Sequence, residues 1–163
     1  MSGDITVRKC DSKDESAFVK LNLDFMREAM AENPYWTSLK APTEQEFNDI
    51  FKEALSMPEH ILIFVAEIDG KVVGYANTWT AYSIWSRGKA LTIDDLYIAL
   101  PYRRRGIGEK MVECLIEFAE KNGYRRVQLH AELNNDKAHS LYRKLGFDGE
   151  GMMFFMKTIE IQE

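Results

Sequence analysis

The sequence has little cysteine and no long apolar segment, and each absence excludes a class of protein. Its two cysteines, Cys10 and Cys114, lie far apart without the spacing of a metal site, so we expect reduced structural thiols and no bound metal. No apolar run approaches the ~18 residues that a membrane-spanning helix needs. The N-terminus, Met-Ser-Gly-Asp-Ile-Thr, lacks the cationic start and apolar core of a secretory leader. We therefore expect a cytoplasmic protein.

Positive charge is also scarce. The chain has 21 Lys and Arg against 26 Asp and Glu, a formal net charge of -5, and no basic tail. This balance argues against nucleic acid or a membrane as partner, and it suits a cationic small molecule better. With 163 residues, 45% of them hydrophobic, the chain is long enough to bury one core, and it shows no repeat or linker. We expect a single domain over 1–163.

The pattern of apolar residues predicts an α/β protein. It predicts strands at 5–9, 61–68, 72–82, 90–98, 127–131 and 152–161, and helices at 14–30, 43–55, 109–121 and 136–145. Thr43 and Glu46 form a capping box, Asp69-Gly70 is a hairpin turn, and 33–36 is expected to be an aromatic loop. The order βααβββαβαβ places these elements in one mixed sheet with helices on its faces.

The most informative segment runs from Leu96 to Gly108 and reads LYIALPYRRRGIG. An apolar strand leads through a proline into a glycine-containing loop, and a helical pattern follows. The first turn of a helix presents unpaired N–H groups and a positive dipole end, which bind phosphate oxygens. Three arginines add positive charge, and Gly106 and Gly108 allow the backbone to approach the ligand. The segment predicts a pyrophosphate cradle, with a solvated arginine-rich turn as the alternative.

Two common phosphate-binding motifs are absent. The dinucleotide fingerprint requires a third glycine where Met111 stands, and the P-loop requires Gly-Lys-Ser or Gly-Lys-Thr. Neither motif therefore accounts for the cradle, and the rest of the chain must identify it.

A second motif follows at 135–147 and reads NDKAHSLYRKLGF. Arg103-x-x-Gly106-x-Gly108 together with Asn135-x-x-Ala138-x-x-Leu141-Tyr142-x-x-Leu145-Gly146-Phe147 resembles the GNAT superfamily of acetyl-CoA-dependent N-acetyltransferases. The segment 88–98 is similar to the strand before the loop in spermidine/spermine (diamine) acetyltransferases. The resemblance implies the GNAT-like acyl-CoA N-acyltransferase fold over nearly the whole chain, with acetyl-CoA as co-substrate.

The resemblance also implies how the co-substrate is held. In the family, the strand before the loop separates from its neighbour, and its backbone pairs with the pantetheine arm as an added strand. In this sequence the resemblance implies that the arm pairs with the backbone of Leu96, Tyr97 and Ile98. Asn135 and Tyr142 match positions that contact the arm and the thioester. The pyrophosphate would lie against Arg103, Arg104, Arg105, Gly106, Ile107, Gly108 and Glu109.

Acetyl transfer to an amine requires a base and an acid. A primary amine has a pKa of about 10.4, so the neutral nucleophile costs about 4.6 kcal/mol at pH 7 unless a base takes its proton. The resemblance implies Asp94 as base. Asp95 is the alternative, because strand side chains alternate and one of the two faces the reacting centre. The diamine-type enzymes that it resembles usually carry glutamate here, so the shorter aspartate favours a relay through water. Both aspartates could instead form ion pairs.

Tyr142 matches the general acid beside the thioester sulfur, and a core aromatic is its alternative role. A tyrosine has a pKa of about 10 against about 8.5 for a simple thiol, so its hydroxyl could donate to the departing thiolate. His60, His130 and His139 accompany no serine or cysteine motif, and we assign them no catalytic role.

The acceptor site is expected between the first two helices and the following loops. Carboxylates attract an ammonium group, and aromatic faces add ~0.5–2 kcal/mol of cation-π stabilisation. An ordinary solvated helix face with tryptophans that anchor packing is the alternative. The candidates are Glu28, Tyr35, Trp36, Tyr82, Trp85 and Asp95, with Asp24 and Glu32 nearby.

These patterns predict an N-acetyltransferase that moves the acetyl group of acetyl-CoA to a primary amine by direct attack in a ternary complex. A small cationic amine such as a polyamine is the expected acceptor. The alternatives are a protein lysine or N-terminal acetyltransferase and a non-catalytic acyl-CoA-binding regulatory module. Met152 to Met156 could pair across a two-fold axis, so a homodimer is expected, with an intramolecular core strand as the alternative.

Overall fold

The computed structural model describes residues 3–37 and 40–159. The chain divides into two compact units, Met1–His130 and Ala131–Glu163. The first unit contains the sheet and most helices, and the second contains one helix and the C-terminal segment. A single domain over the whole chain stays a prediction.

A five-stranded mixed sheet forms the first unit, which confirms the predicted fold class. Its strand order is β1-β2-β3-β4-β5. The first four strands pair antiparallel in succession, and β5 joins β4 in parallel. The strands are β1 (Ile5–Lys9), β2 (Ile61–Ile68), β3 (Lys71–Ser83), β4 (Gly88–Ile98) and β5 (Arg126–Leu129).

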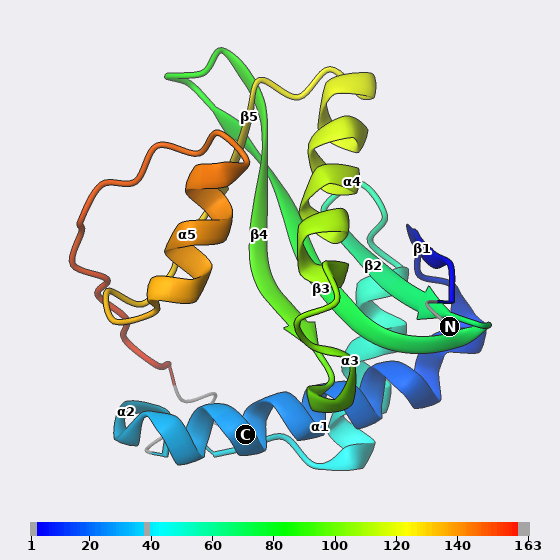
Figure 1. Cartoon of the computed structure of the whole chain (residues 1–163). Coiled ribbons are helices and arrows are strands. Elements are labelled where there is room, and N and C mark those ends of the chain that lie inside the picture. Colours follow the sequence, from blue (N-terminus) through cyan, green and yellow to red (C-terminus); the bar gives the residue numbers. More distant parts are fainter. Residues whose placement is uncertain (1–2, 38–39, 160–163) are drawn as a thin grey trace. The chain divides into compact units, whose positions relative to one another are not determined.

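Four α-helices and two short 3-10 turns connect these strands. Between β1 and β2 lie η1 (Ser12–Asp14), α1 (Glu15–Glu32), α2 (Pro34–Thr37) and α3 (Glu44–Leu55). Between β4 and β5 lie η2 (Leu100–Tyr102) and α4 (Ile107–Lys121). Figure 1 shows α3 and α4 on opposite sides of the strands.

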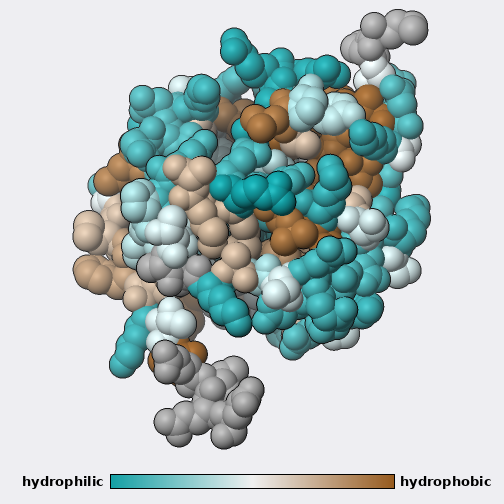
Figure 2. Space-filling model, turned by 90° about the horizontal axis from the view of Figure 1, so that it is seen from below, coloured by the Kyte–Doolittle hydropathy of each residue, from teal (hydrophilic) through white to brown (hydrophobic). Residues whose placement is uncertain are grey.

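Helices cover both faces of the sheet. On β2, Ile63 and Val65 pack into the clusters that include α1 and α3, whereas the Phe64 ring lies 5.3 Å from the Phe118 ring of α4. Neighbouring strand residues point to opposite faces, and β2 is apolar from Ile61 to Ala66 because both of its faces are buried there. The exposed residues of α1 include Ser16, Lys20 and Arg27. Figure 2, which views the molecule from below, shows hydrophilic residues with hydrophobic ones among them.

The structure confirms the turn and the helix cap that local sequence signals predict. Asp69 and Gly70 both have positive φ, 50° and 76°, as a two-residue hairpin turn of the favoured type requires. Thr43 Oγ1 accepts from Glu46 N–H at 3.2 Å, and the Glu46 carboxylate accepts from Thr43 N–H at 2.6 Å, which is the reciprocal capping box.

Two predicted elements are wrong. The aromatic loop is the short helix α2, because Asn33 caps it by accepting from Tyr35 N–H at 3.0 Å, and Pro34 is pre-organised for the first helical position. The final strand does not form in the described part of its range, where 152–159 has no regular structure; residues 160–161 lie outside the described residues. Apolar β-forming residues make a strand only when a neighbouring strand pairs with them.

The second unit contains α5 (Asp136–Lys144). Asn135 caps it, since its side-chain oxygen accepts from Ala138 N–H at 3.2 Å, and the chain then turns through Gly146 at φ 86°. The ring of Tyr142 lies 5.7 Å from that of Phe147. Further on, the side chains of Met152 and Phe155 are exposed.

Both cysteines are free thiols, and both are half-buried. Burial raises the pKa of Cys10 to about 12 and also raises that of Cys114, which suits structural thiols. Among the helices of residues 3–37 and 40–159, none is long and apolar enough to cross a membrane.

Candidate active site

The sheet opens along β4. The β4–β5 ladder runs from Ala90 opposite Arg126 to Ile93 opposite Leu129 and ends there. From 94 to 98, β4 continues with β3 as its ladder partner within the described residues. The side of β4 that faced β5 is therefore left as a strand edge. Such an edge can accept an extended ligand as an added strand.

A β-bulge lies at the point where the sheet opens. Asn77 of β3 is opposite Asp95, but the next residue, Thr78, is opposite Ile93, so Asp94 is an extra residue on β4. Asp94 is exposed, whereas Asp95 is half-buried. Simple alternation of side chains, which the sequence prediction assumed for the two aspartates, does not hold across this bulge.

The glycine loop has the backbone geometry that a phosphate cradle requires. Arg104 and Gly106 have left-handed backbones, with φ of 63° and 78°, and Gly106 caps α4. A cap without a side chain leaves the first-turn N–H groups of α4 for a ligand. No atom lies within 4 Å of the place where a Cβ on Gly106 would stand, so the space over the loop is open. The geometry fits a pyrophosphate group.

Only part of the predicted arginine cluster is available to a ligand. Arg104 and Arg105 are exposed. Arg103 instead donates through an Nη atom to Glu28 of α1 at 2.6 Å and through Nε to the Ile98 carbonyl at 2.7 Å. A guanidinium with two such bonds orients the loop, so a role for Arg103 in binding phosphate stays a prediction.

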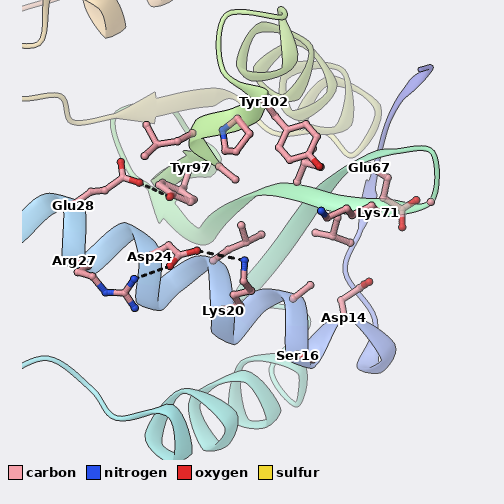
Figure 3. A pocket seen from close by; sticks show the side chains of 18 of the residues that line it. Asp14, Ser16, Lys20, Asp24, Arg27, Glu28, Glu67, Lys71, Tyr97 and Tyr102 are labelled. Atoms are coloured by element: carbon pink, nitrogen blue, oxygen red, sulfur yellow. Dashed lines mark hydrogen bonds and ion pairs between the residues drawn. The ribbon is translucent and has the colours of Figure 1, made fainter. Parts of the chain in front are cut away.

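Glu28 is likewise engaged inside the protein. Its second oxygen accepts from the Tyr97 hydroxyl at 2.6 Å, and Arg103 lies over the Tyr97 ring. Glu28 was expected to hold the acceptor amine. In the structure it bonds to Tyr97 near the end of β4 (Figure 3) and to Arg103 in the loop before α4.

A cavity of about 1040 Å³ lies between α1, the β2–β3 turn and the end of β4. Glu28 and Tyr97 form part of its wall (Figure 3). Every carboxylate on this wall is paired with a protein cation, so the cavity is not the acidic aromatic pocket that the sequence predicted. The pairs are Asp14 and Glu67 with Arg8, Asp24 with Lys20 and Arg27, and Glu28 with Arg103.

The residues expected to form one acceptor pocket are separated along the first unit. Tyr82 pairs with Lys89 near the tip of the β3–β4 hairpin, and Tyr97 lies eight residues further along β4, about 26 Å away at ~3.3 Å per residue. Trp85 stands at the tip and is 95% exposed. Glu28 is bonded to Tyr97 at the other end of the strand, so a pocket containing Glu28, Tyr82 and Trp85 is wrong.

The two other aromatic candidates lie on α2. The rings of Tyr35 and Trp36 contact each other with centroids 4.9 Å apart in an edge-to-face arrangement. An acceptor-binding role for this pair stays a prediction, as it does for Asp95.

Asp95 belongs to a buried polar group that sequence reasoning missed. Its carboxylate accepts from Asn77 Nδ2 at 3.0 Å. Burial raises the pKa of Asp95, the Asn77 hydrogen bond opposes that shift, and the charge of Asp94 adds to it. A carboxyl group with a raised pKa is a better base near neutral pH than an exposed one. The signal in the sequence was the polar Asn77 directly after the buried residues Val73 to Ala76.

In the second unit, Tyr142 is half-buried, and burial raises the pKa of its hydroxyl. The group therefore stays protonated at neutral pH, as a proton donor must. Asn135 uses its side-chain oxygen to cap α5, so its amide N–H groups remain for another partner. The roles of both residues stay predictions.

Comparison with known proteins decides the family. Residues 23–147 match the model of the Acetyltransferase (GNAT) family. The chain belongs to this family. It is therefore an acetyl-CoA-dependent N-acetyltransferase, and the open β4 edge and the glycine cradle fit acetyl-CoA as co-substrate.

Relatives are similar along most of the chain. The uncharacterized N-acetyltransferase YhfO of Bacillus subtilis is 24% identical over 116 residues, which cover 71% of this chain and 78% of that protein. Human N-acetyltransferase 8 is 29% identical over 126 residues, covering 77% of this chain and 55% of that protein. An aminoglycoside N-acetyltransferase solved with CoA superposes with a TM-score of 0.77 at 14% identity, with 97% of each chain covered, which shows a shared fold.

Proposed function

We propose that this acetyltransferase acetylates the primary amine of a small polycationic acceptor, by direct attack in a ternary complex with acetyl-CoA. The observation that carries the proposal is the end of the β4–β5 ladder at Ile93, followed further along the chain by the glycine loop at the start of α4. A pantetheine arm laid along Leu96 to Ile98 would place the pyrophosphate at the N-terminus of α4 and the thioester beside the bulge.

The reaction moves two protons. The acceptor ammonium loses one to a base, the neutral nitrogen bonds to the acetyl carbon, the carbon–sulfur bond breaks, and the second amine proton ends on the CoA thiol. Asp95 is supported as base by its partial burial, its raised pKa and its hydrogen bond to Asn77. Asp94 matches the family position for the base, but it is exposed. Tyr142 is the proposed acid at the sulfur.

A cationic acceptor is supported by the net charge of -5 and by the family. The resemblance of 88–98 to diamine acetyltransferases favours a polyamine, and the shared fold of an aminoglycoside N-acetyltransferase favours a larger polyamine-like sugar. Both classes carry several ammonium groups. A protein lysine or N-terminal acceptor and a non-catalytic acyl-CoA-binding module are the alternatives.

The test is release of free CoA thiol from acetyl-CoA with a panel of spermidine, spermine, diamines, aminoglycosides, lysine derivatives and short peptides. We expect saturable turnover on polycationic small molecules. Turnover on peptides alone would favour protein acetylation, and CoA binding without any turnover would favour the regulatory module.

Variants of the two aspartates assign the base. We expect Asp95→Asn to lower kcat by ~10²- to 10⁴-fold, the range of general base catalysis, with much less effect in Asp94→Asn. Glu120→Gln, which removes an exposed carboxylate near the end of α4, serves as the control for lost negative charge. Equal activity of the Asp95→Asn enzyme and the wild type would exclude Asp95.

A further inference from the structure

The side chain of Arg103 lies at the end of the open edge of β4. Ala99 N–H donates to the Val73 carbonyl of β3 at 2.9 Å. Opposite residues of antiparallel strands alternate between pairs that exchange hydrogen bonds and pairs that do not. The backbone groups of Ile98 therefore point away from β3, toward the open edge. Arg103 Nε donates to the Ile98 carbonyl at 2.7 Å, so the last carbonyl of this edge is already bonded to a side chain.

The same alternation shows which backbone groups the edge still offers. The Tyr97 backbone faces β3, and the Leu96 backbone faces the open edge. An extended ligand laid along the edge can bond to the N–H and C=O of Leu96 and to the N–H of Ile98. It cannot bond to the Ile98 carbonyl while Arg103 occupies it. Arg103 thus marks the residue at which such a ligand must leave the strand.

Two side chains hold Arg103 in this position. Glu28 of α1 accepts from an Arg103 Nη atom at 2.6 Å, and the Tyr97 hydroxyl donates to the other Glu28 oxygen at 2.6 Å (Figure 3). The guanidinium also lies 5.2 Å from the centroid of the Tyr97 ring. Burial and the bond to Glu28 raise the pKa of Tyr97, so its hydroxyl stays a donor. The guanidinium is therefore fixed by a carbonyl, a carboxylate and an aromatic face.

Arg103 also stands where the chain enters the cradle. The next residue, Arg104, has a left-handed backbone with φ 63°, and Gly106, with φ 78°, caps α4. The side chain of Arg103 ties this entry back to the end of β4 and to α1. Fixing Arg103 therefore fixes the start of the loop relative to the strand edge.

We propose that Arg103 is a positioning residue for acetyl-CoA rather than a phosphate ligand. It ends the open edge at Ile98, so that the pantetheine arm leaves the strand there and the pyrophosphate reaches the cradle. Glu28 and Tyr97 keep Arg103 in place and are positioning residues in turn. The inference rests on the proposed placement of the arm along β4.

A direct contact between Arg103 and the pyrophosphate is the competing interpretation. The two interpretations predict opposite effects of Glu28→Gln. If Arg103 bound phosphate, the Glu28 carboxylate would compete for its guanidinium, and loss of that charge would release Arg103 and lower the Kd of acetyl-CoA. If Arg103 is a positioning residue, a weaker hold on it loosens the edge and the loop, and the Kd rises.

The first experiment is a calorimetric titration of acetyl-CoA into Glu28→Gln, Tyr97→Phe and a matched control. Glu67→Gln is the control, because it breaks the 2.6 Å pair of Glu67 with Arg8, and its side chain is 20% exposed against 25% for Glu28. We expect Glu28→Gln and Tyr97→Phe to raise the Kd about 3- to 30-fold. Glu67→Gln should lower Tm and leave the Kd unchanged. A Kd in Glu28→Gln at or below the wild-type value would overturn the positioning role, and so would an equal rise in Glu67→Gln.

The second experiment replaces Arg103 itself. A lysine keeps the charge that a phosphate ligand needs, but a single ammonium cannot reproduce the fork of bonds to Ile98 and Glu28. We expect Arg103→Lys to raise the Kd as much as Arg103→Gln does, and wild-type affinity in Arg103→Lys would overturn the proposal. Glu28→Gln should have no further effect in the Arg103→Gln protein, because the two residues act as one unit.

Gly106→Ala separates this inference from the proposed placement of the ligand. An unchanged Kd in Gly106→Ala would refute the placement of arm and pyrophosphate, and the inference with it. A raised Kd in Gly106→Ala together with an unchanged Kd in Glu28→Gln would overturn the positioning role alone.

Discussion

Replacing Gly106 with alanine separates the conformation of the cradle from its contact with the ligand. Gly106 has φ 78°, a left-handed backbone that costs an L-residue about 1–2 kcal/mol. A Cβ there meets no atom within 4 Å, so this strain is the whole effect on the free protein. At ~2–4 °C per kcal/mol for a chain of this size, Tm should fall by about 2–8 °C.

Gly123 provides the matched control. It has φ 71° beyond the C-terminus of α4, and a Cβ there also meets no atom within 4 Å. Gly123→Ala should therefore lower Tm by a similar amount. Its effect on acetyl-CoA binding should be negligible, because it stands at the opposite end of the helix from the cradle.

Acetyl-CoA affinity should distinguish the two variants. A Cβ on Gly106 would stand where the pyrophosphate approaches, and losing one N–H bond to a charged group costs about 1.5–3 kcal/mol. The Kd of Gly106→Ala should rise by about 10- to 100-fold in a calorimetric titration, and Gly106→Val should raise it further. Equal Kd values for the Gly106→Ala and Gly123→Ala proteins would refute the cradle.

Three further predictions concern single side chains. Tyr142→Phe should lower kcat by ~10²- to 10⁴-fold and leave the Kd of CoA unchanged, and wild-type turnover would remove Tyr142 from the mechanism. Burial opposes ionisation of Asp14, but the Arg8 guanidinium outweighs burial and holds the pKa of Asp14 below its usual range. The stability that this pair contributes is present above about pH 4 and is lost as the pH falls through the lowered pKa. An equal loss of stability at low pH in the Asp14→Asn protein would contradict this assignment. Glu28→Gln should lower the free energy of unfolding in urea by about 1 kcal/mol after allowance for solvent screening. The exposed Glu32→Gln should lower it by less than ~0.5 kcal/mol. Equal losses in the two variants would show that the Glu28–Arg103 pair does not stabilise the fold.

Local signals in the sequence predicted what local interactions determine. The Thr43 capping box and the Asp69-Gly70 turn each depend on residues within a few positions of one another. The same is true of most helix and strand positions, because apolar periodicity reflects which face is buried.

Features that depend on distant residues were not predicted. The Glu28–Arg103 pair joins residues 75 positions apart, and nothing in either local segment indicates it. The hairpin carries Trp85 away from Glu28 because β3 and β4 are long, which composition alone does not show. The predicted C-terminal strand does not form, because a strand requires a neighbouring strand with which to pair.

The bulge at Asp94 shifts the phase of β4 by half a period. Ile93 and Asp95 are two residues apart and would share a face in a regular strand, yet their partners Thr78 and Asn77 are adjacent and face opposite sides. The strand therefore changes which of its residues face α1 at the point where the sheet opens. If Asp94 instead took an ordinary place in the ladder, Asp95 and Tyr97 would share the α4 face with Ile93, and the carboxylate would lie on the other side of the sheet, with no change in the identity of either residue. One inserted residue thus gives this strand a second inward-facing set of side chains.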